Sequence, residues 1–123
     1  MQANQAPNSQ LIKEDLRGGI NINIIGGMEI AIIHTKAGFY RAGDYHSVVQ
    51  YSLVLKGEIE ITLRQNHQDI IKKYRANEFI IIPANIPHLY KSIVDSIMVE
   101  WLAGPFKPMY YEPYRKIVKR QLK

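Results

Sequence analysis

The sequence predicts an all-β domain, a sandwich or barrel of short antiparallel strands followed by one short C-terminal helix. Two observations lead to this prediction. Apolar residues recur with period two from residue 20 to about residue 102, and Gly, Asn and Asp interrupt that stretch at short intervals. Helical spacing of apolar residues begins only after residue 104. Strands that follow one another without crossover helices exclude a parallel, doubly wound sheet of the Rossmann type.

Length and composition agree with one domain that has a sizeable core. The chain has 123 residues, of which 46% are hydrophobic and 22% charged, so it is not disordered throughout. The lack of cysteine excludes disulfides, thiolate ligands and a cysteine nucleophile, and it fits a cytoplasmic protein. No apolar run approaches the roughly 18 residues that cross a membrane. A bound metal must therefore be held by nitrogen and oxygen.

About eight strands are expected in the middle of the chain. The clearest is the stretch 58–64, in which Ile59, Ile61 and Leu63 share one face and charged or hydroxyl residues occupy the other. The other candidates are residues 20–25, 28–35, 48–55, 69–74, 78–82, 87–92 and 97–102. Short connections rich in turn-forming residues join them, which favours a sandwich or barrel.

The two ends of the chain differ from this strand-rich part. We expect a polar N-terminal arm and first edge segment over residues 1–19, a barrel over 20–104, and a basic helix packed on the barrel over 105–123. Residues 1–104 hold ten basic and ten acidic side chains, whereas 105–123 hold six and one, so the net charge of +5 lies in the tail. A solvated helix face explains this charge, and an acidic partner is the alternative. Nucleic-acid binding is not expected, because the bases are confined to one short helix.

Two histidines, His46 and His88, lie in sequence contexts that differ from those of ordinary strand residues. In the first, Asp44, His46 and Gln50 have the same parity, so one extended strand would project all three toward one volume. In the second, a buried strand ends at Pro83, and a turn that contains a further proline then presents His88 with little freedom. The predicted chemistry depends on these side chains meeting at a common centre.

The two segments resemble the paired motifs of the cupins, small domains with a double-stranded β-helix or jelly-roll barrel. The first cupin motif has two histidines, a glutamate and a glycine, and the matching positions in this chain are Asp44, His46, Gln50 and Gly57. The second has a glycine, a proline, a glycine, a histidine and an asparagine, matched here by Asn77, Pro83, Asn85, His88 and Ser92. Spacing is kept in both. Asn tolerates the left-handed backbone that glycine supplies, so the turns are expected to survive.

The resemblance implies a divalent metal ion, Fe, Mn, Ni or Zn, at the mouth of the barrel. Cupins hold it with three imidazoles and one carboxylate, and the corresponding set here is Asp44, His46, Gln50 and His88. The carboxylate has moved to the first position and an amide stands at the third, so the formal ligand charge is unchanged. Two histidines and one carboxylate also resemble the facial set of non-haem iron sites. The alternative is that Asp44 and Gln50 are what remains of a lost site.

A ligand pocket beside the metal is expected to use one basic and three aromatic side chains. Arg41 is the candidate anion contact, Tyr51 and Tyr90 are candidate pocket walls, and His34 is a candidate at the barrel mouth. Glu100 is expected to point outward, because an acid facing the core would need a polar partner.

The function implied by the resemblance is metal-dependent chemistry on a small, oxygen-rich, anionic metabolite such as a sugar acid or keto acid. Isomerase, lyase and oxygenase reactions all fit such a centre. A non-catalytic ligand-binding or sensor module is the alternative, since one fold hosts many functions. A homodimer formed through edge strands is expected as well, and a membrane partner is not.

Overall fold

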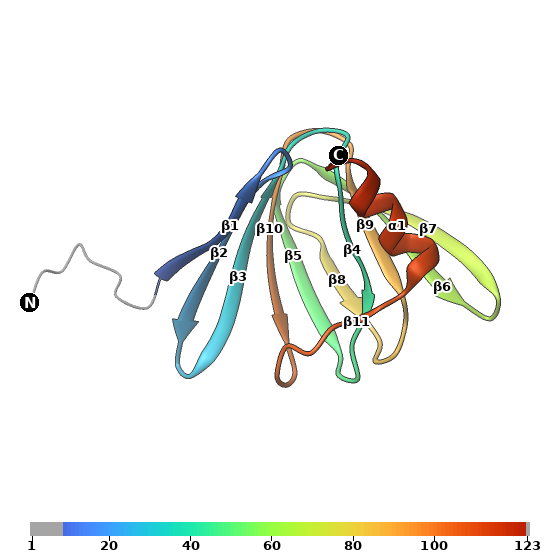
Figure 1. Ribbon diagram of the computed structural model, residues 1–123. Helices are drawn as coiled ribbons and strands as arrows, with labels where there is room; N and C mark the ends of the chain where they lie inside the picture. The colour runs from blue at the N-terminus through green and yellow to red at the C-terminus, as the bar shows by residue number, and fades with distance from the viewer. Residues whose placement is uncertain (1–8, 123) are drawn as a thin grey trace, which may run out of the picture.

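Two antiparallel sheets packed face to face form the computed structural model, which describes residues 9–122 (Figure 1). The six-stranded sheet has the order β1-β2-β3-β10-β5-β8, and the five-stranded sheet has the order β11-β4-β9-β6-β7. The neighbouring strands pair antiparallel. The predicted all-β jelly-roll architecture is confirmed. Residues 1–8 of the predicted N-terminal arm and edge segment (1–19) lie outside the described residues, as does Lys123.

All the strands expected between residues 20 and 102 are present, with ends shifted by two residues at most. The elements are β1 (Ser9–Asp15), β2 (Gly18–Ile25), β3 (Met28–Thr35), β4 (Tyr40–Tyr45), β5 (Gln50–Lys56), β6 (Glu58–Gln65), β7 (Gln68–Arg75), β8 (Phe79–Ile82), β9 (His88–Ser92), β10 (Ser96–Leu102), β11 (Met109–Tyr110) and α1 (Glu112–Arg120). Strands β1, β4 and β11 are additions to the expected set. Strand β1 is polar and lies at a sheet edge, and β11 has two residues, so neither carries a clear period-two signal.

Strand β4 lacks the period-two signal because it contains a bulge. Ala42 and Gly43 have φ values of 77° and 74°, and the pairing with β9 shifts between Ala42 and Asp44. Arg41 and Asp44 are both buried, with 6% and 7% of their surface exposed. Because of the bulge, two charged side chains of one short strand, Arg41 and Asp44, both point into the interior of the sandwich.

The main core lies between the two sheets. The inward positions of β6 hold Ile59 and Ile61, those of β8 hold Ile80 and Ile82, and β5 contributes Val54, all exposed by 3% or less. Burial of each such side chain stabilises the fold by about 1.5–3 kcal/mol. The apolar positions predicted for residues 58–64 are thus the ones that face the core between the sheets.

Helix α1 covers the outer face of the five-stranded sheet (Figure 1). Tyr114 and Val118, 6% and 0% exposed, pack with Leu89 of β9 in a second cluster. Pro113 lies in the first turn, where its missing N–H leaves no helical hydrogen bond unmade, so the helix starts near the proline. Among the described residues, no helix has the length and apolar character needed to cross a membrane.

The bases of α1 divide between the sheet and solvent. Arg115 donates from Nη1 to the carbonyl oxygen of Ala42 at 2.8 Å, and its guanidinium lies 4.6 Å from the ring centroid of Tyr110. The other basic side chains of the helix are exposed: Lys116, Lys119 and Arg120. One base of the tail therefore helps to fix the helix on β4.

Candidate metal centre

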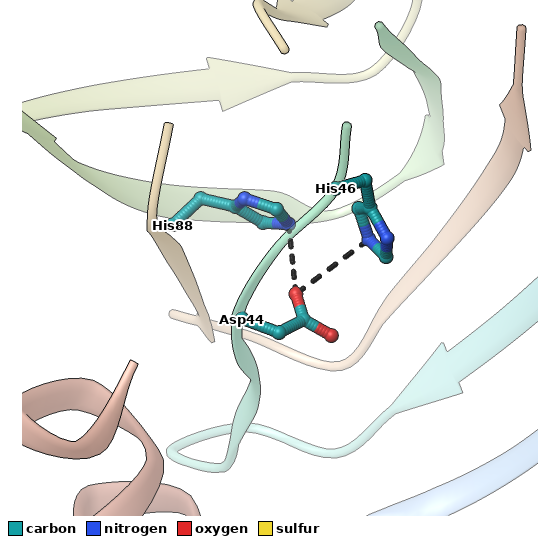
Figure 2. Close-up of side chains that lie close together, drawn as sticks. All are labelled: Asp44, His46 and His88. Atoms are coloured by element: carbon teal, nitrogen blue, oxygen red, sulfur yellow. Dashed lines mark ion pairs between the residues drawn. The ribbon is translucent and has the colours of Figure 1, made fainter. Parts of the chain in front are cut away.

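Three metal-ligating side chains converge inside the sandwich. Figure 2 shows Asp44 from β4, His46 from the loop after β4, and His88 from the start of β9 directed toward one another. One ligand atom from each lies within 4.8 Å of the other two. Asp44 Oδ1 is 3.1 Å from His88 Nε2 and 3.7 Å from His46 Nε2. All three residues are buried, so the charge they carry needs compensation.

Gln50 reaches the same region from the opposite sheet. The expectation that Asp44, His46 and Gln50 share one extended strand was wrong, because β4 ends at Tyr45 and β5 begins at Gln50 with a bend between them. Asp44 therefore belongs to the five-stranded sheet and Gln50 to the six-stranded sheet. Gln50 is 1% exposed and close enough to His46 to act on the pKa of its imidazole. The four side chains meet although the local geometry differs from the predicted one.

Two asparagines at cupin glycine positions adopt the left-handed backbone. Asn77 has a φ of 73° and Asn85 a φ of 65°, as the sequence analysis expects. The backbone N–H of Asn85 donates to the carbonyl oxygen of His46 at 2.6 Å. The turn before β9 is therefore tied directly to the loop that carries the first histidine.

The orientation of His88 is set by a hydrogen bond on the far side of its ring. Its Nδ1 lies 3.0 Å from the carbonyl oxygen of Ile86, and this contact makes Nδ1 the protonated nitrogen of a neutral imidazole. Nε2, the remaining nitrogen, then presents a lone pair toward Asp44. Such a backbone partner on the second ring nitrogen is the usual support of a metal-binding histidine.

Four buried polar atoms in this region have no hydrogen-bond partner. They are Asp44 Oδ1, His46 Nδ1, Gln50 Oε1 and His88 Nε2, and they are the only such side-chain atoms among residues 13–122, whose side chains the structure describes. The approach of Asp44 to His88 is short but lacks hydrogen-bond geometry. A buried polar atom left unpaired costs about 1–3 kcal/mol. Carboxylate oxygen, amide oxygen and imidazole nitrogen are donors that divalent metals accept, so this set fits a metal ion.

Glu100 belongs to the site and points inward, contrary to the outward position predicted from the sequence. Gln50 Nε2 donates to Glu100 Oε1 at 2.7 Å and also to the hydroxyl oxygen of Tyr90. The expectation of an outward Glu100 was wrong because Gln50, on the neighbouring strand, supplies the polar partner that an inward acid needs. Both contacts use the amide nitrogen of Gln50, so they leave its Oε1 free for another partner.

Burial and the Asp44 carboxylate together set the ionisation of the site. Burial raises the pKa of Glu100 to about 7 and raises the pKa of Tyr90 well above its usual value. Burial also lowers the pKa of His46, although Asp44 opposes this shift. For His88, burial is the largest single cause and lowers the pKa, but the Asp44 carboxylate, the Ile86 carbonyl and Glu100 together outweigh it, so the pKa is raised. At neutral pH the site thus holds an acid, Glu100, that is poised between its two forms, beside one imidazole whose pKa is lowered and one whose pKa is raised.

Two of the four predicted substrate contacts, Tyr90 and Arg41, point into the sandwich. Tyr90 lies with the cluster through its bond with Gln50. Arg41 donates from Nε to Thr35 Oγ1 at 2.6 Å and from Nη2 to the carbonyl oxygen of His34 at 3.0 Å, so it is directed toward the end of β3. It also lines a cavity of about 10 Å³, enough for one water molecule. Arg41 is therefore an interior cation near the site rather than a neighbour of Asp44.

The other two predicted contacts, His34 and Tyr51, lie on the outer face of the six-stranded sheet. His34 is exposed and alternates with the inward Ile33 and Thr35. The ring of Tyr51 stacks on Trp101, with centroids 5.7 Å apart and planes 17° apart. The structure does not bring these two residues together with the cluster.

Phe106 is a residue of the site that was not predicted from the sequence. Its ring centroid lies 5.4 Å from that of His46, and 57% of its surface is exposed. It stands in the irregular segment between β10 and β11, where no strand or helix pattern marks its position. Phe106 thus separates His46 from solvent at the edge of the centre.

Solved structures with the same arrangement of strands have low sequence identity to this chain. The capsular polysaccharide assembling protein CapF from Staphylococcus aureus matches with a TM-score of 0.69 and 19% identity, over 83% of this chain and 32% of CapF. A deletion mutant of Bacillus subtilis oxalate decarboxylase OxdC matches with a TM-score of 0.74 and 10% identity, over 85% and 30% of the two chains. Vicilin from Corylus avellana (hazelnut) matches with 0.73 and 16%, over 86% and 35%.

This chain matches about a third of the length of each of these proteins. Comparison of the sequence with family models finds no match, and comparison with curated proteins finds none either. The resemblance of the two motifs, the two-sheet topology and the structural matches agree with one another. The chain has the cupin fold.

Proposed function

We propose that this chain binds a divalent metal ion through Asp44, His46, Gln50 and His88. The observation that carries the proposal is the convergence of Asp44, His46 and His88 within 4.8 Å of one another, together with a buried, unpaired polar atom on each of these residues and on Gln50. The Mn(II) centres of Bacillus subtilis oxalate decarboxylase, which shares the fold at 13% identity, give further support. A bound ion would act there as a Lewis acid that polarises an oxygen atom of the ligand.

The ligand that we propose is a small, oxygen-rich anion of the sugar-acid or keto-acid class. A divalent ion beside the ionised Asp44 and the partly ionised Glu100 leaves an excess positive charge, and Arg41 adds a further interior cation. Structures with this fold include proteins named for oxalate, a dicarboxylate, and for capsular polysaccharide, both rich in oxygen. Isomerase, lyase and oxygenase reactions fall within this proposal.

The residues around the centre have separate tasks in this proposal. Glu100, with a pKa of about 7, can hold or release a proton at its carboxyl oxygen near neutral pH. Tyr90 stays protonated and offers a hydroxyl, because burial raises its pKa. Phe106 shields His46 from water. Arg41 contributes a long-range electrostatic attraction for an anion.

The proposal is tested by loading the purified chain with Mn²⁺, dialysing it and measuring its metal content. We expect close to one ion per chain. Thermal unfolding is then followed with oxalate, pyruvate or gluconate, and with glycerol as the uncharged control. The acids are expected to raise the midpoint only in the loaded protein. Metal at trace level would contradict the proposal, and turnover of a bound acid would separate an enzyme from a binding module.

The affinity for the metal is expected to fall as the pH is lowered through the neutral range. The imidazoles must be neutral to ligate, and Asp44 raises the pKa of His88, so a proton competes with the metal at His88 from a higher pH than at an ordinary histidine. Burial lowers the pKa of His46, which adds little competition. Below the pKa of His88 the apparent affinity should drop about tenfold per pH unit. Competition titrations against a chelating dye measure it, and a constant affinity from about pH 8 to about pH 6 would contradict the assignment.

A further inference from the structure

The end of the sandwich away from the metal centre holds a second group of buried polar side chains. Thr35 ends β3, Arg41 lies near the start of β4 and Ser92 ends β9, with 8%, 6% and 3% of their surface exposed. All three line the cavity of about 10 Å³ described above. Ser92 follows His88 by four residues on β9, which is roughly 13 Å along an extended strand. The cavity is therefore separate from the metal centre.

Arg41 is a buried cation whose direct partners are uncharged. Its Nε donates to Thr35 Oγ1 at 2.6 Å, and its Nη2 donates to the carbonyl oxygen of His34 at 3.0 Å. Among the residues whose side chains the structure describes, no carboxylate forms an ion pair with this guanidinium. A buried charge without a partner is costly, so a counter-ion beside Arg41 would stabilise the fold.

The charged groups farther from Arg41 do not supply a full counter-charge. Arg17, which is 3% exposed, pairs with Asp15 at 2.8 Å between Nη2 and Oδ2, so these two charges largely cancel. Glu100 is the other acid that acts on the pKa of Arg41, but burial raises the pKa of Glu100 to about 7, so it is only partly ionised at neutral pH. Burial lowers the pKa of Arg41 to about 10, and the guanidinium therefore stays charged.

The polar groups that line the cavity can donate hydrogen bonds into it. Thr35 Oγ1 accepts the bond from Arg41, which leaves its own O–H to donate. Arg41 Nη1 and Ser92 Oγ have no hydrogen-bond partner among the residues whose side chains the structure describes. Both atoms keep a little accessible surface where they line the cavity, unlike the four enclosed atoms of the metal centre. Three donors and one positive charge therefore meet at this place.

A small anion matches this cavity better than a water molecule does. A volume of about 10 Å³ is close to the smallest that holds one particle of the size of water, so a carboxylate or a phosphate does not fit. A water molecule accepts two of the donated hydrogen bonds at most and leaves the charge of Arg41 uncompensated. A halide ion, only slightly larger, accepts all of them and neutralises that charge.

We propose that one chloride ion binds in this cavity, held by Arg41, Thr35 and Ser92. The site does not depend on a metal, because it uses none of the four residues of the metal centre. With chloride bound, Arg41 would attract an anionic ligand of the metal centre less strongly, so chloride is expected to weaken the binding of such a ligand.

Crystals of the full chain soaked in sodium bromide test the proposal, because bromide takes the place of chloride and can be located by its anomalous scattering. We expect one peak in the interior, in contact with Arg41 and Ser92. Peaks confined to the surface of the molecule, which indicate an adventitious ion only, would overturn the proposal.

Thermal unfolding of the same chain is followed in sodium chloride and, at equal ionic strength, in sodium methanesulfonate, whose anion is too large for the cavity. Above the Kd, each tenfold increase in chloride should raise the midpoint by about 4–8 °C, because the ion binds only the folded state. Midpoints that depend on ionic strength alone would contradict the proposal.

Two interior substitutions and one control locate the ion. Arg41→Met removes the cation, and Ser92→Val fills part of the cavity with a methyl group while Arg41 remains. Both variants are expected to lose the interior bromide peak and the response to chloride. Arg75→Met is the matched control, because the side chain of Arg75 on β7 is 79% exposed, and it should keep both. Far-UV circular dichroism reports folding. An interior peak that persists in either folded variant, or one that is lost in Arg75→Met, would overturn the proposal.

Discussion

Replacement of His88 by alanine is expected to abolish stoichiometric metal binding and to weaken the affinity by about a hundredfold or more. His88 is 1% exposed, its Nδ1 faces the carbonyl oxygen of Ile86, and its Nε2 lies 3.1 Å from Asp44 Oδ1. The substitution removes one of the two imidazole donors and leaves the Asp44 carboxylate with a single histidine beside it. Elemental analysis after dialysis gives the metal content, and a chelator competition gives the affinity.

The matched control is His34→Ala. His34 is exposed on the outer side of β3, so the variant should keep the metal content of the parent. His88→Gln tests the shape of the site, because its side chain fills part of the imidazole volume and offers an oxygen donor. The ligand assignment would be wrong if His88→Ala, folded by circular dichroism, bound the metal as tightly as the parent.

Replacement of Gly43 by alanine is expected to destabilise the fold by about 2–4 kcal/mol and to loosen α1. A Cβ at Gly43 would lie 2.8 Å from Cα and 2.9 Å from N of Arg115, which are backbone atoms that move only with the helix. The φ of 74° adds strain of about 1–2 kcal/mol. Because Asp44 is the next residue, metal affinity should fall as well. Chemical denaturation measures the free energy of unfolding.

Gly27→Ala isolates the helix contact from the backbone strain. Gly27 has a φ of 78°, close to that of Gly43, but a Cβ there would meet no atom within 4 Å. The difference between the two variants therefore reports the clash with Arg115. Equal losses of stability would contradict the view that α1 rests on this glycine.

The sequence predicted the fold well where each strand has one buried and one solvated face. Residues 58–64 show this most clearly, because Ile59 and Ile61 alternate with polar residues and are buried as expected. Strand β4 was not predicted, because the positive φ values of Ala42 and Gly43 interrupt the alternation of inward and outward side chains. Propensity and parity describe regular strands and fail at a bulge, where tertiary contacts decide the conformation.

The members of the candidate centre could be predicted, whereas its surroundings could not. Motif spacing brought Asp44, His46, Gln50 and His88 into one set, although the strand geometry assumed for three of them was wrong. Glu100 shares a face with the buried Met98, which was an available signal, but its partner Gln50 lies fifty residues away in the chain.

The outward position of Tyr51 could not be predicted from the strand alternation either. Parity separates the two faces of a strand but does not say which face is inside when both carry residues that can be buried. In β5 the inward positions hold the polar Gln50 and Ser52, and the outward ones hold Tyr51 and Leu53. At the start of β5 the inward positions are thus more polar than the outward ones, which inverts the usual rule and reflects the polar cluster that Gln50 joins, whereas Val54 farther along the strand belongs to the apolar core.

The hydrogen bond from the N–H of Asn85 to the carbonyl oxygen of His46 joins two loops that are distant in sequence. The loop after β4, which carries His46, and the loop before β9, which leads to His88, are consequently tied to each other. An ion bound in this region would meet nitrogen donors whose positions this hydrogen bond already restricts. Less chain entropy would then be lost on loading, and more of the free energy of ligation would be retained as affinity.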